Sequence, residues 1–338
     1  MALYQSGTAT GPNNLLDTLR QFLIDNSWTV NGWTTVGAGY RLHVEKEISS
    51  SSENMFFNFR SAIAETGDTL IAEDNLGGAG GTVTGICING STGYSGGSDW
   101  EKQPGYTTNP NATNKSTANV MTPMSVSAIP AYYFYAVGDS VHVVVEVTAG
   151  VFQFMSFGCL VKQGEYTGGQ YYSASWDSRA PQTNYLASSY GPKYFTYNYN
   201  QSSYLNGAVY VDADGTEDWR VADGDSDDQE IVWSGVPSSP GLTGTHPLRG
   251  MCTPFYEKAP NSYNNISAAC PIYTLLYRSD DNYSLIGWPE GVRFLNVTNY
   301  TPAQELTYGD DTWMVFESDS GDVAPGWPGC GFAFKKEV

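Results

Sequence analysis

The strongest local signal for chemistry is the acidic segment Asp212–Glu230. Five of its carboxylates are spaced so that they could converge on a hard cation: Asp212, Asp214, Asp223, Asp225 and Asp227. An EF-hand counted from Asp223 needs Gly at its sixth position and Glu at its twelfth, where this chain has Asp228 and Ser234. The EF-hand motif therefore fails, and two interpretations stay open for Asp223, Asp225 and Asp227: a loop-type calcium site or a solvated acidic loop.

Paired carboxylates could also serve glycoside hydrolysis, and the 24 Tyr and 9 Trp residues could stack on sugars. Spacing along the sequence does not give the distance between two carboxylates, and aromatic residues are also enriched at protein–protein interfaces. A receptor- or carbohydrate-binding protein, with or without glycan-degrading activity, is therefore the alternative to a protein that works by assembly.

Three histidines could act as bases near neutral pH. His43 and His142 lie within expected strands, so we interpret both as structural. His246 precedes Pro247 in a loop, where nothing nearby suggests a ligand set. The segment Gly93–Gly97 is faintly similar to a serine-protease nucleophile loop, but it lacks the acidic residue of that motif. We name no catalytic residue and expect no cofactor.

The five cysteines are widely spaced and form no CxxC pair, which argues against a zinc site. Cys159 lies in an apolar run and is expected to be a small buried hydrophobe. Cys252 and Cys270 could meet in a loop. The N-terminal residues lack the basic and apolar regions of a signal peptide, so synthesis in a reducing cytoplasm is expected.

Charge and composition narrow the classes of partner. A formal net charge of −19, without a cluster of Lys and Arg, disfavours nucleic acid and anionic membranes. Charged residues make up only 15% of the chain and aromatic residues 14%, a composition typical of an extended β protein. No uncharged apolar run reaches about 18 residues, so membrane insertion is not expected.

The segment Ala131–Lys162 is the longest apolar stretch, and its apolar residues recur at every second position, as in strands. Turn residues at 137–140 and 148–150 divide it into a three-stranded meander. The expected strands are 132–136, 141–147 and 151–161. The residues expected in the core of the protein are Leu19, Phe22, Val143, Val145, Phe154, Phe157, Trp313 and Phe316.

One helix is expected near the N-terminus, where apolar residues lie at helical spacing between Leu15 and Leu23. It should begin near Pro12 and end near Asn26, and a turn is expected at Asn31-Gly32. The other expected strands are Tyr40–Glu47, Met55–Ala64, Thr82–Ile88, Gly207–Val211, Ile231–Trp233, Pro271–Tyr277, Val292–Val297, Thr312–Glu317 and Phe332–Lys335. Thr301–Leu306 could form one helical turn.

These elements predict a mainly β fold, with antiparallel sheets in a sandwich or meander, one short N-terminal amphipathic helix and long polar loops. Residues 1–90 should hold the helix and the first strands. Residues 91–122 are expected to form an extended loop or arm that could become ordered against a neighbour. Residues 123–338 should form a β-rich body with long Tyr/Ser/Asn/Gly loops.

Three parts of the chain resemble structural proteins of tailed-bacteriophage virions. They are SGTATGPNNLLDTLRQFLIDNSW with the following GYRLHVEKE, the meander from AYYFYAVGDS to the Tyr-rich loop, and GWPEGVRFLN with YGDDTWMVFES. In that family a short helix precedes a Trp-containing turn and a β-rich body. The long Tyr/Ser/Asn middle of this chain departs from the family pattern.

The resemblance implies a non-enzymatic structural protein of the virion, in the tail or the baseplate. It also implies assembly in the host cytoplasm, with other virion proteins and copies of the same chain as partners. Aromatic sheet faces would be buried against neighbouring subunits, and polar loops would reach across them.

Overall fold

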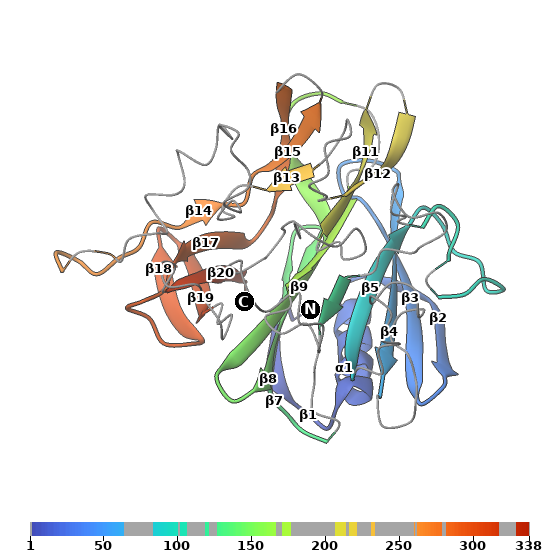
Figure 1. Ribbon diagram of the computed structural model, residues 1–338, viewed down its shortest axis with the longest axis horizontal. Helices are drawn as coiled ribbons and strands as arrows, with labels where there is room; N and C mark the ends of the chain where they lie inside the picture. Colours follow the sequence, from blue (N-terminus) through green and yellow to red (C-terminus); the bar gives the residue numbers. More distant parts are fainter. Residues whose placement is uncertain are drawn as a thin grey trace, which may run out of the picture.

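A computed structural model describes residues 2–63, 84–100, 102–106, 119–121, 127–166, 171–176, 207–213, 216–221, 231–233, 260, 262–278, 282–317 and 329–337. Within these residues the chain forms one helix and three antiparallel sheets (Figure 1). The predicted mainly β fold, with antiparallel sheets and a short N-terminal helix, is confirmed.

Helix α1 spans Pro12–Asp25, as its apolar spacing predicts. Pro12 lies in the first turn, where its missing N–H costs no hydrogen bond. Asn26 ends the helix: its backbone N–H donates to the carbonyl of Phe22, and its side-chain amide donates to the same oxygen at 2.9 Å. The apolar stripe is buried, at Leu15, Leu16, Leu19, Phe22 and Leu23.

The first sheet has the strand order β2-β3-β4-β5-β6. Its strands are β2 (Thr29–Val36), β3 (Gly39–Glu47), β4 (Asn54–Ala62), β5 (Gly85–Ser91) and β6 (Asn119–Met121). The turn expected at Asn31-Gly32 is wrong, because β2 continues through it and the register with β3 shifts between Val30 and Gly32. A β-bulge at an edge strand thus accommodates the turn-forming pair.

The central sheet has the order β1-β7-β8-β9-β10-β11-β12, and β16 pairs with the end of β9. Its strands along this order are β1 (Tyr4–Ala9), β7 (Ile129–Val137), β8 (Ser140–Thr148), β9 (Val151–Lys162), β10 (Tyr171–Trp176), β11 (Gly207–Ala213) and β12 (Thr216–Val221). The branch through β16 (Asn282–Pro289) adds β15 (Thr274–Arg278) and β13 (Ile231–Trp233). The predicted meander is therefore present as β7–β9.

The C-terminal sheet has the order β14-β17-β20-β19-β18. Its strands are β14 (Cys270–Pro271), β17 (Val292–Asn296), β20 (Cys330–Lys336), β19 (Asp311–Glu317) and β18 (Gln304–Tyr308). The helical turn expected over Thr301–Leu306 is wrong, because residues from Gln304 onward pair with β19, including Leu306 opposite Trp313. Pairing with a strong apolar strand overrides the weak local preference of this segment.

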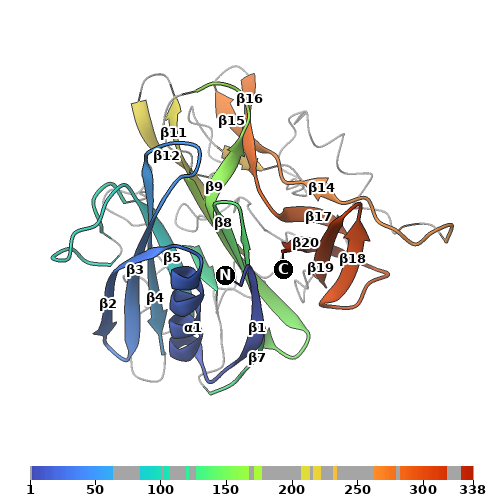
Figure 2. The same cartoon turned by 180° about the vertical axis from the view of Figure 1, so that it is seen from behind.

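The central sheet lies between the other two, with the first sheet and α1 on one side and the C-terminal sheet on the other (Figures 1 and 2). Alternate side chains of β8 enter different hydrophobic cores: Val143 and Val145 pack with the first sheet, and Val144 packs with the C-terminal sheet. All eight residues predicted for the core are at most 5% exposed. The meander is thus buried on both faces.

Two segments expected to be loops contain strands. Within 91–122, residues 119–121 form β6. Within Asp212–Glu230, the chain forms the end of β11 and all of β12, and Trp219 of β12 is 5% exposed in the first core. Pairing with β11 along its whole length and the burial of Trp219 together stabilise this strand in a mostly polar sequence. The domain boundaries at 90 and 122 stay a prediction.

Candidate functional site

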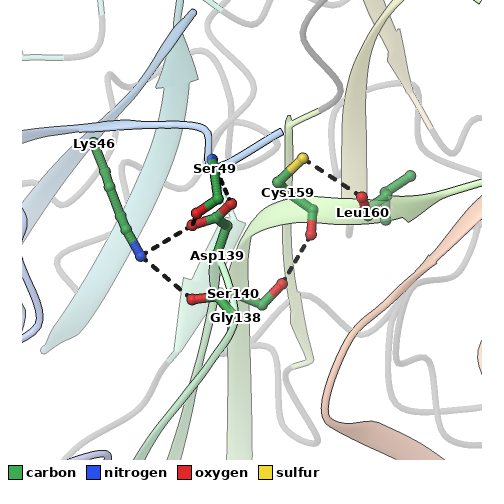
Figure 3. A network of polar contacts seen from close by, with 7 residues as sticks. All are labelled: Lys46, Ser49, Gly138, Asp139, Ser140, Cys159 and Leu160. Atoms are coloured by element: carbon green, nitrogen blue, oxygen red, sulfur yellow. Dashed lines mark hydrogen bonds and ion pairs between the residues drawn. The ribbon is translucent and has the colours of Figure 1, made fainter. Parts of the chain in front are cut away.

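The β7–β8 turn gathers polar side chains from two sheets (Figure 3). Asp139 lies in this turn, while Lys46 is on β3 and Ser49 follows it. We call these three residues, with Ser140 and Cys159, the turn cluster. Figure 3 shows Lys46 and Ser49 reaching from the first sheet toward the Asp139 carboxylate.

The Asp139 carboxylate accepts from three donors. Lys46 Nζ lies 3.1 Å from Oδ1, the Ser49 hydroxyl donates to Oδ1 at 2.8 Å, and the Ser49 backbone N–H donates to Oδ2 at 2.8 Å. Lys46 also donates to the carbonyl of Gly138 at 3.3 Å. The carboxylate oxygens are thus used within the protein, so Asp139 fastens the first sheet to the central one.

The other side of the turn is bonded to β9. The Ser140 hydroxyl donates to the carbonyl of Cys159 at 2.9 Å, and the Cys159 backbone N–H donates to the carbonyl of Asp139. Burial, and next the nearby Asp139 charge, raise the pKa of the Cys159 thiol to about 12. Only a thiolate is a strong nucleophile, so the Cys159 thiol is a weak nucleophile near neutral pH. Its side chain packs against the first core but is half-buried, not fully buried as the sequence predicts.

His142 lies on β8 at the second core. Its Nε2 lies 2.6 Å from the carbonyl of Glu290, which can only accept, so Nε2 carries the proton and Nδ1 accepts from the Ser156 hydroxyl at 2.8 Å. Burial lowers the pKa of His142 to about 4. A serine hydroxyl and a histidine imidazole in contact are also the groups of a serine–histidine catalytic pair. Here, however, His142 and Ser156 are both fully buried, and the Phe334 ring lies 5.4 Å from the His142 ring. This geometry supports the structural interpretation of His142.

His43 belongs to a second buried polar group. Its Nδ1 lies 2.7 Å from Asn58 Oδ1, and the Asn58 amide donates to the Ser91 hydroxyl at 2.9 Å. The Tyr94 ring packs on the imidazole at 5.1 Å. Burial lowers the pKa of His43, although the Asn58 hydrogen bond acts in the opposite direction. These bonds join β3, β4 and β5 and again support a structural interpretation.

The segment Gly93–Gly97 is organised around a glutamine. Gln103, which is 1% exposed, accepts from the Ser95 backbone N–H at 2.8 Å and donates to the carbonyl of Asp99 at 2.9 Å. These bonds define a compact loop stabilised by an internal amide. Its likeness to a nucleophile loop is confined to the sequence.

The candidate metal ligands Asp223, Asp225 and Asp227 lie outside the described residues, as do His246 and Cys252. Among the residues that the structure describes, no three His, Cys, Asp or Glu side chains come together in a way that could hold a metal ion. The calcium hypothesis and the pairing of Cys252 with Cys270 therefore stay predictions.

Sequence reasoning missed the turn cluster. Ser49 and Asp139 are 90 residues apart, and neither lies in a motif that announces a long-range contact. A partial signal was present, because the turn at Gly138-Asp139 interrupts a strongly apolar stretch with a charge. A charge placed there needs a partner. Here the partner is the cation of Lys46, on the sheet packed beside the turn.

Comparison of the sequence with models of known protein families and with curated proteins finds no match. Within the described part of the chain, α1 is too short and too polar to cross a membrane, and no other helix is present there.

Proposed function

We propose that this chain is a structural subunit of a tailed-bacteriophage particle, in the tail or baseplate, and that it acts by assembly without catalysis. The observation that carries the proposal concerns Ala131–Lys162, a segment that resembles phage structural proteins. Its strands form the middle of the central sheet, with a hydrophobic core on each face. The apolar side chains of this segment therefore hold a scaffold of three sheets together.

Three ionisable groups of this scaffold, among the residues that the structure describes, are consistent with the proposal. The Asp139 carboxylate is used to join two sheets, His142 stays neutral near pH 7, and the Cys159 thiol stays protonated. A set of reactive groups would instead be expected to face a cleft with pKa values close to the working pH.

The proposal is tested in a phage whose genome encodes this chain. A nonsense mutation in the reading frame should give particles without complete tails in electron micrographs, and expression of the wild-type chain in the host should restore them. Mass spectrometry of purified wild-type particles should find the protein at several copies per particle. Normal tails in the mutant, or absence of the protein from the particles, would falsify the proposal.

A variant of the acidic segment separates assembly from receptor or glycan binding. With Asp223→Asn, Asp225→Asn and Asp227→Asn combined, we expect complete particles that still adsorb to the host. If the particles assemble but adsorption or glycan cleavage is lost, the chain is a receptor- or carbohydrate-binding tail protein. The matched control is Asp25→Asn with Glu47→Gln and Glu53→Gln, which removes three exposed charges elsewhere.

A further inference from the structure

The segment before β14, residues 262–269, projects from the body of the protein beside the C-terminal sheet (Figures 1 and 2). Two of its side chains are the most exposed large apolar groups of the described residues: Tyr263 is 93% exposed and Ile266 is 55% exposed. Scattered exposed apolar residues are ordinary, but two such residues three positions apart on a projection form a small contact surface.

The base of the projection is fixed by tyrosine hydroxyl groups. The Ser267 backbone N–H donates to the Tyr300 hydroxyl at 2.8 Å, and the Tyr308 hydroxyl donates to the Ser267 carbonyl at 2.9 Å. The Ser267 hydroxyl donates to the Asn296 carbonyl, and Ser267 is 3% exposed. The tip of the projection, residues 263–266, is therefore held on a rigid base. This reduces the conformational entropy that the tip loses when it binds.

The tip is shaped locally as well. Asn264 Oδ1 accepts from the Ile266 backbone N–H at 3.1 Å, and Asn265 has a φ of 56°, in the left-handed region. This hydrogen bond makes an Asx turn, which fixes the backbone between Tyr263 and Ile266. The exposure of Tyr263 and Ile266 is thus a property of an ordered turn.

The charge pattern of this segment suits a second copy of the same acidic chain as the partner. Residues 259–277 contain no Asp, Glu, Lys or Arg, whereas the whole chain carries a formal charge of −19. Two copies of so acidic a chain repel each other, and screening over about 8 Å leaves the charges nearest the contact as the ones that matter. A contact made by the same neutral segment of both copies brings no like charges together from that segment.

We propose that residues 262–269 form a homotypic contact, in which Tyr263 and Ile266 of one copy pack against the same segment of a second copy across a two-fold axis. A two-fold contact uses one self-complementary patch twice, which a neutral apolar tip satisfies. This inference rests on the proposed function, in that it names one of the self-contacts through which the subunit would assemble.

The test uses the purified full-length chain in analytical ultracentrifugation from about 1 µM to 1 mM, because a contact made by two side chains per copy is expected to be weak. The wild-type chain should dimerise. The variant Tyr263→Ser with Ile266→Ser should raise the dimer dissociation constant about 10-fold or more, because exposed aromatic anchors dominate contact energies. The matched control is Ile24→Ser with Leu285→Ser, which removes apolar side chains that are 40% and 38% exposed elsewhere and should leave the dimer unchanged.

A photo-crosslinking amino acid at position 263 fixes the geometry. It should link two copies through peptides that contain residues 262–269 on both sides. A wild-type chain that stays monomeric, a double variant that dimerises like wild type, or links to another surface would each overturn the inference. The proposed function is judged separately: a monomeric chain that is still present in purified particles overturns only the homotypic contact.

Discussion

Gly158 shows how one residue allows β9 to pass under the β7–β8 turn. Its φ is +134°, and a Cβ at this position would lie 2.2 Å from the Asp139 carbonyl oxygen and 2.6 Å from the Ser140 Cα. These are backbone atoms, which cannot rotate away as a long side chain could. Gly158→Ala should therefore lower the free energy of unfolding by about 2–5 kcal/mol, measured by urea denaturation.

Variants at two other glycines allow the cost of backbone strain to be measured apart from the cost of steric overlap. Gly150 has a φ of +77°, and no atom lies within 4 Å of the place that an added methyl group would take, so Gly150→Ala should cost only about 1 kcal/mol of strain. Gly97 has open space and no left-handed φ, so Gly97→Ala should stay within about 0.5 kcal/mol of wild type. Equal stability of the three variants would show that the packing at Gly158 is not as described.

His142 should make stability depend on pH. Its pKa is about 4 when folded and 6.5 when exposed, so the unfolded chain binds more protons between these values. The contribution of His142 to the free energy of unfolding is then fully present above pH 6.5, and it falls by about 3 kcal/mol as the pH drops to 4. Glu290, whose pKa is raised by burial and by Glu337, contributes in the opposite direction and reduces the net loss.

The contribution of His142 is isolated by the variant His142→Gln, followed by urea denaturation at several pH values. The loss of stability between pH 6.5 and 4 should be smaller in the variant than in wild type, because Gln does not titrate. Between pH 7 and 8 the two proteins should differ by a constant amount. An unchanged acid slope would mean that His142 is not held neutral in the fold.

At the scale of elements, the ion pair of the turn cluster couples β3 to the β7–β8 turn. The Lys46 and Asp139 side chains are only 18% and 12% exposed, whereas those of Arg20 and Asp17 on α1 are 26% and 50% exposed. A double-mutant cycle with Lys46→Met and Asp139→Asn should give a coupling energy of about 1 kcal/mol. The corresponding cycle with Arg20→Met and Asp17→Asn should give less than about 0.5 kcal/mol. Equal coupling in the two cycles would argue against a fastening role.

The elements that the sequence predicts well are those whose pattern is local. The meander β7–β9 alternates strongly enough that its strands are found within a few residues of their ends. Strands β1 and β18 were missed because their side chains are mostly half-buried or exposed, and their strand character comes from pairing with β7 and β19. Such pairing is a tertiary property that a local pattern cannot encode.

At the scale of the whole molecule, burial on both faces should make the middle of the central sheet the most stable region. Hydrogen exchange followed by mass spectrometry should find β8 and β9 exchanging last, and the edge strands β2 and β18, which are largely half-buried or exposed, exchanging early. Exchange of β8 at the rate of β2 would contradict the three-layer arrangement.

The candidate site was less predictable than the fold. The sequence directs attention to histidines, the acidic segment and the glycine-rich loop, because these residue types are chemically conspicuous. The structure shows His43 and His142 buried and hydrogen-bonded inside the protein, and the contacts that join the sheets come from Lys46, Ser49 and Asp139. Which polar residues meet depends on how sheets stack, and this follows only from the complete topology.

The double burial of β8 and β9 has a consequence for synthesis. The strands that cover Val143 precede the meander in the chain, whereas the sheet that covers Val144 and Phe154 is complete only at Lys336. Roughly 170 residues separate Lys162 from Lys336, and at about 5–20 residues per second the ribosome needs about 10–30 s to make them. During that interval the C-terminal sheet, which covers this apolar face in the folded protein, has not been made. We therefore expect chaperone supply and translation speed to affect the yield of folded chain.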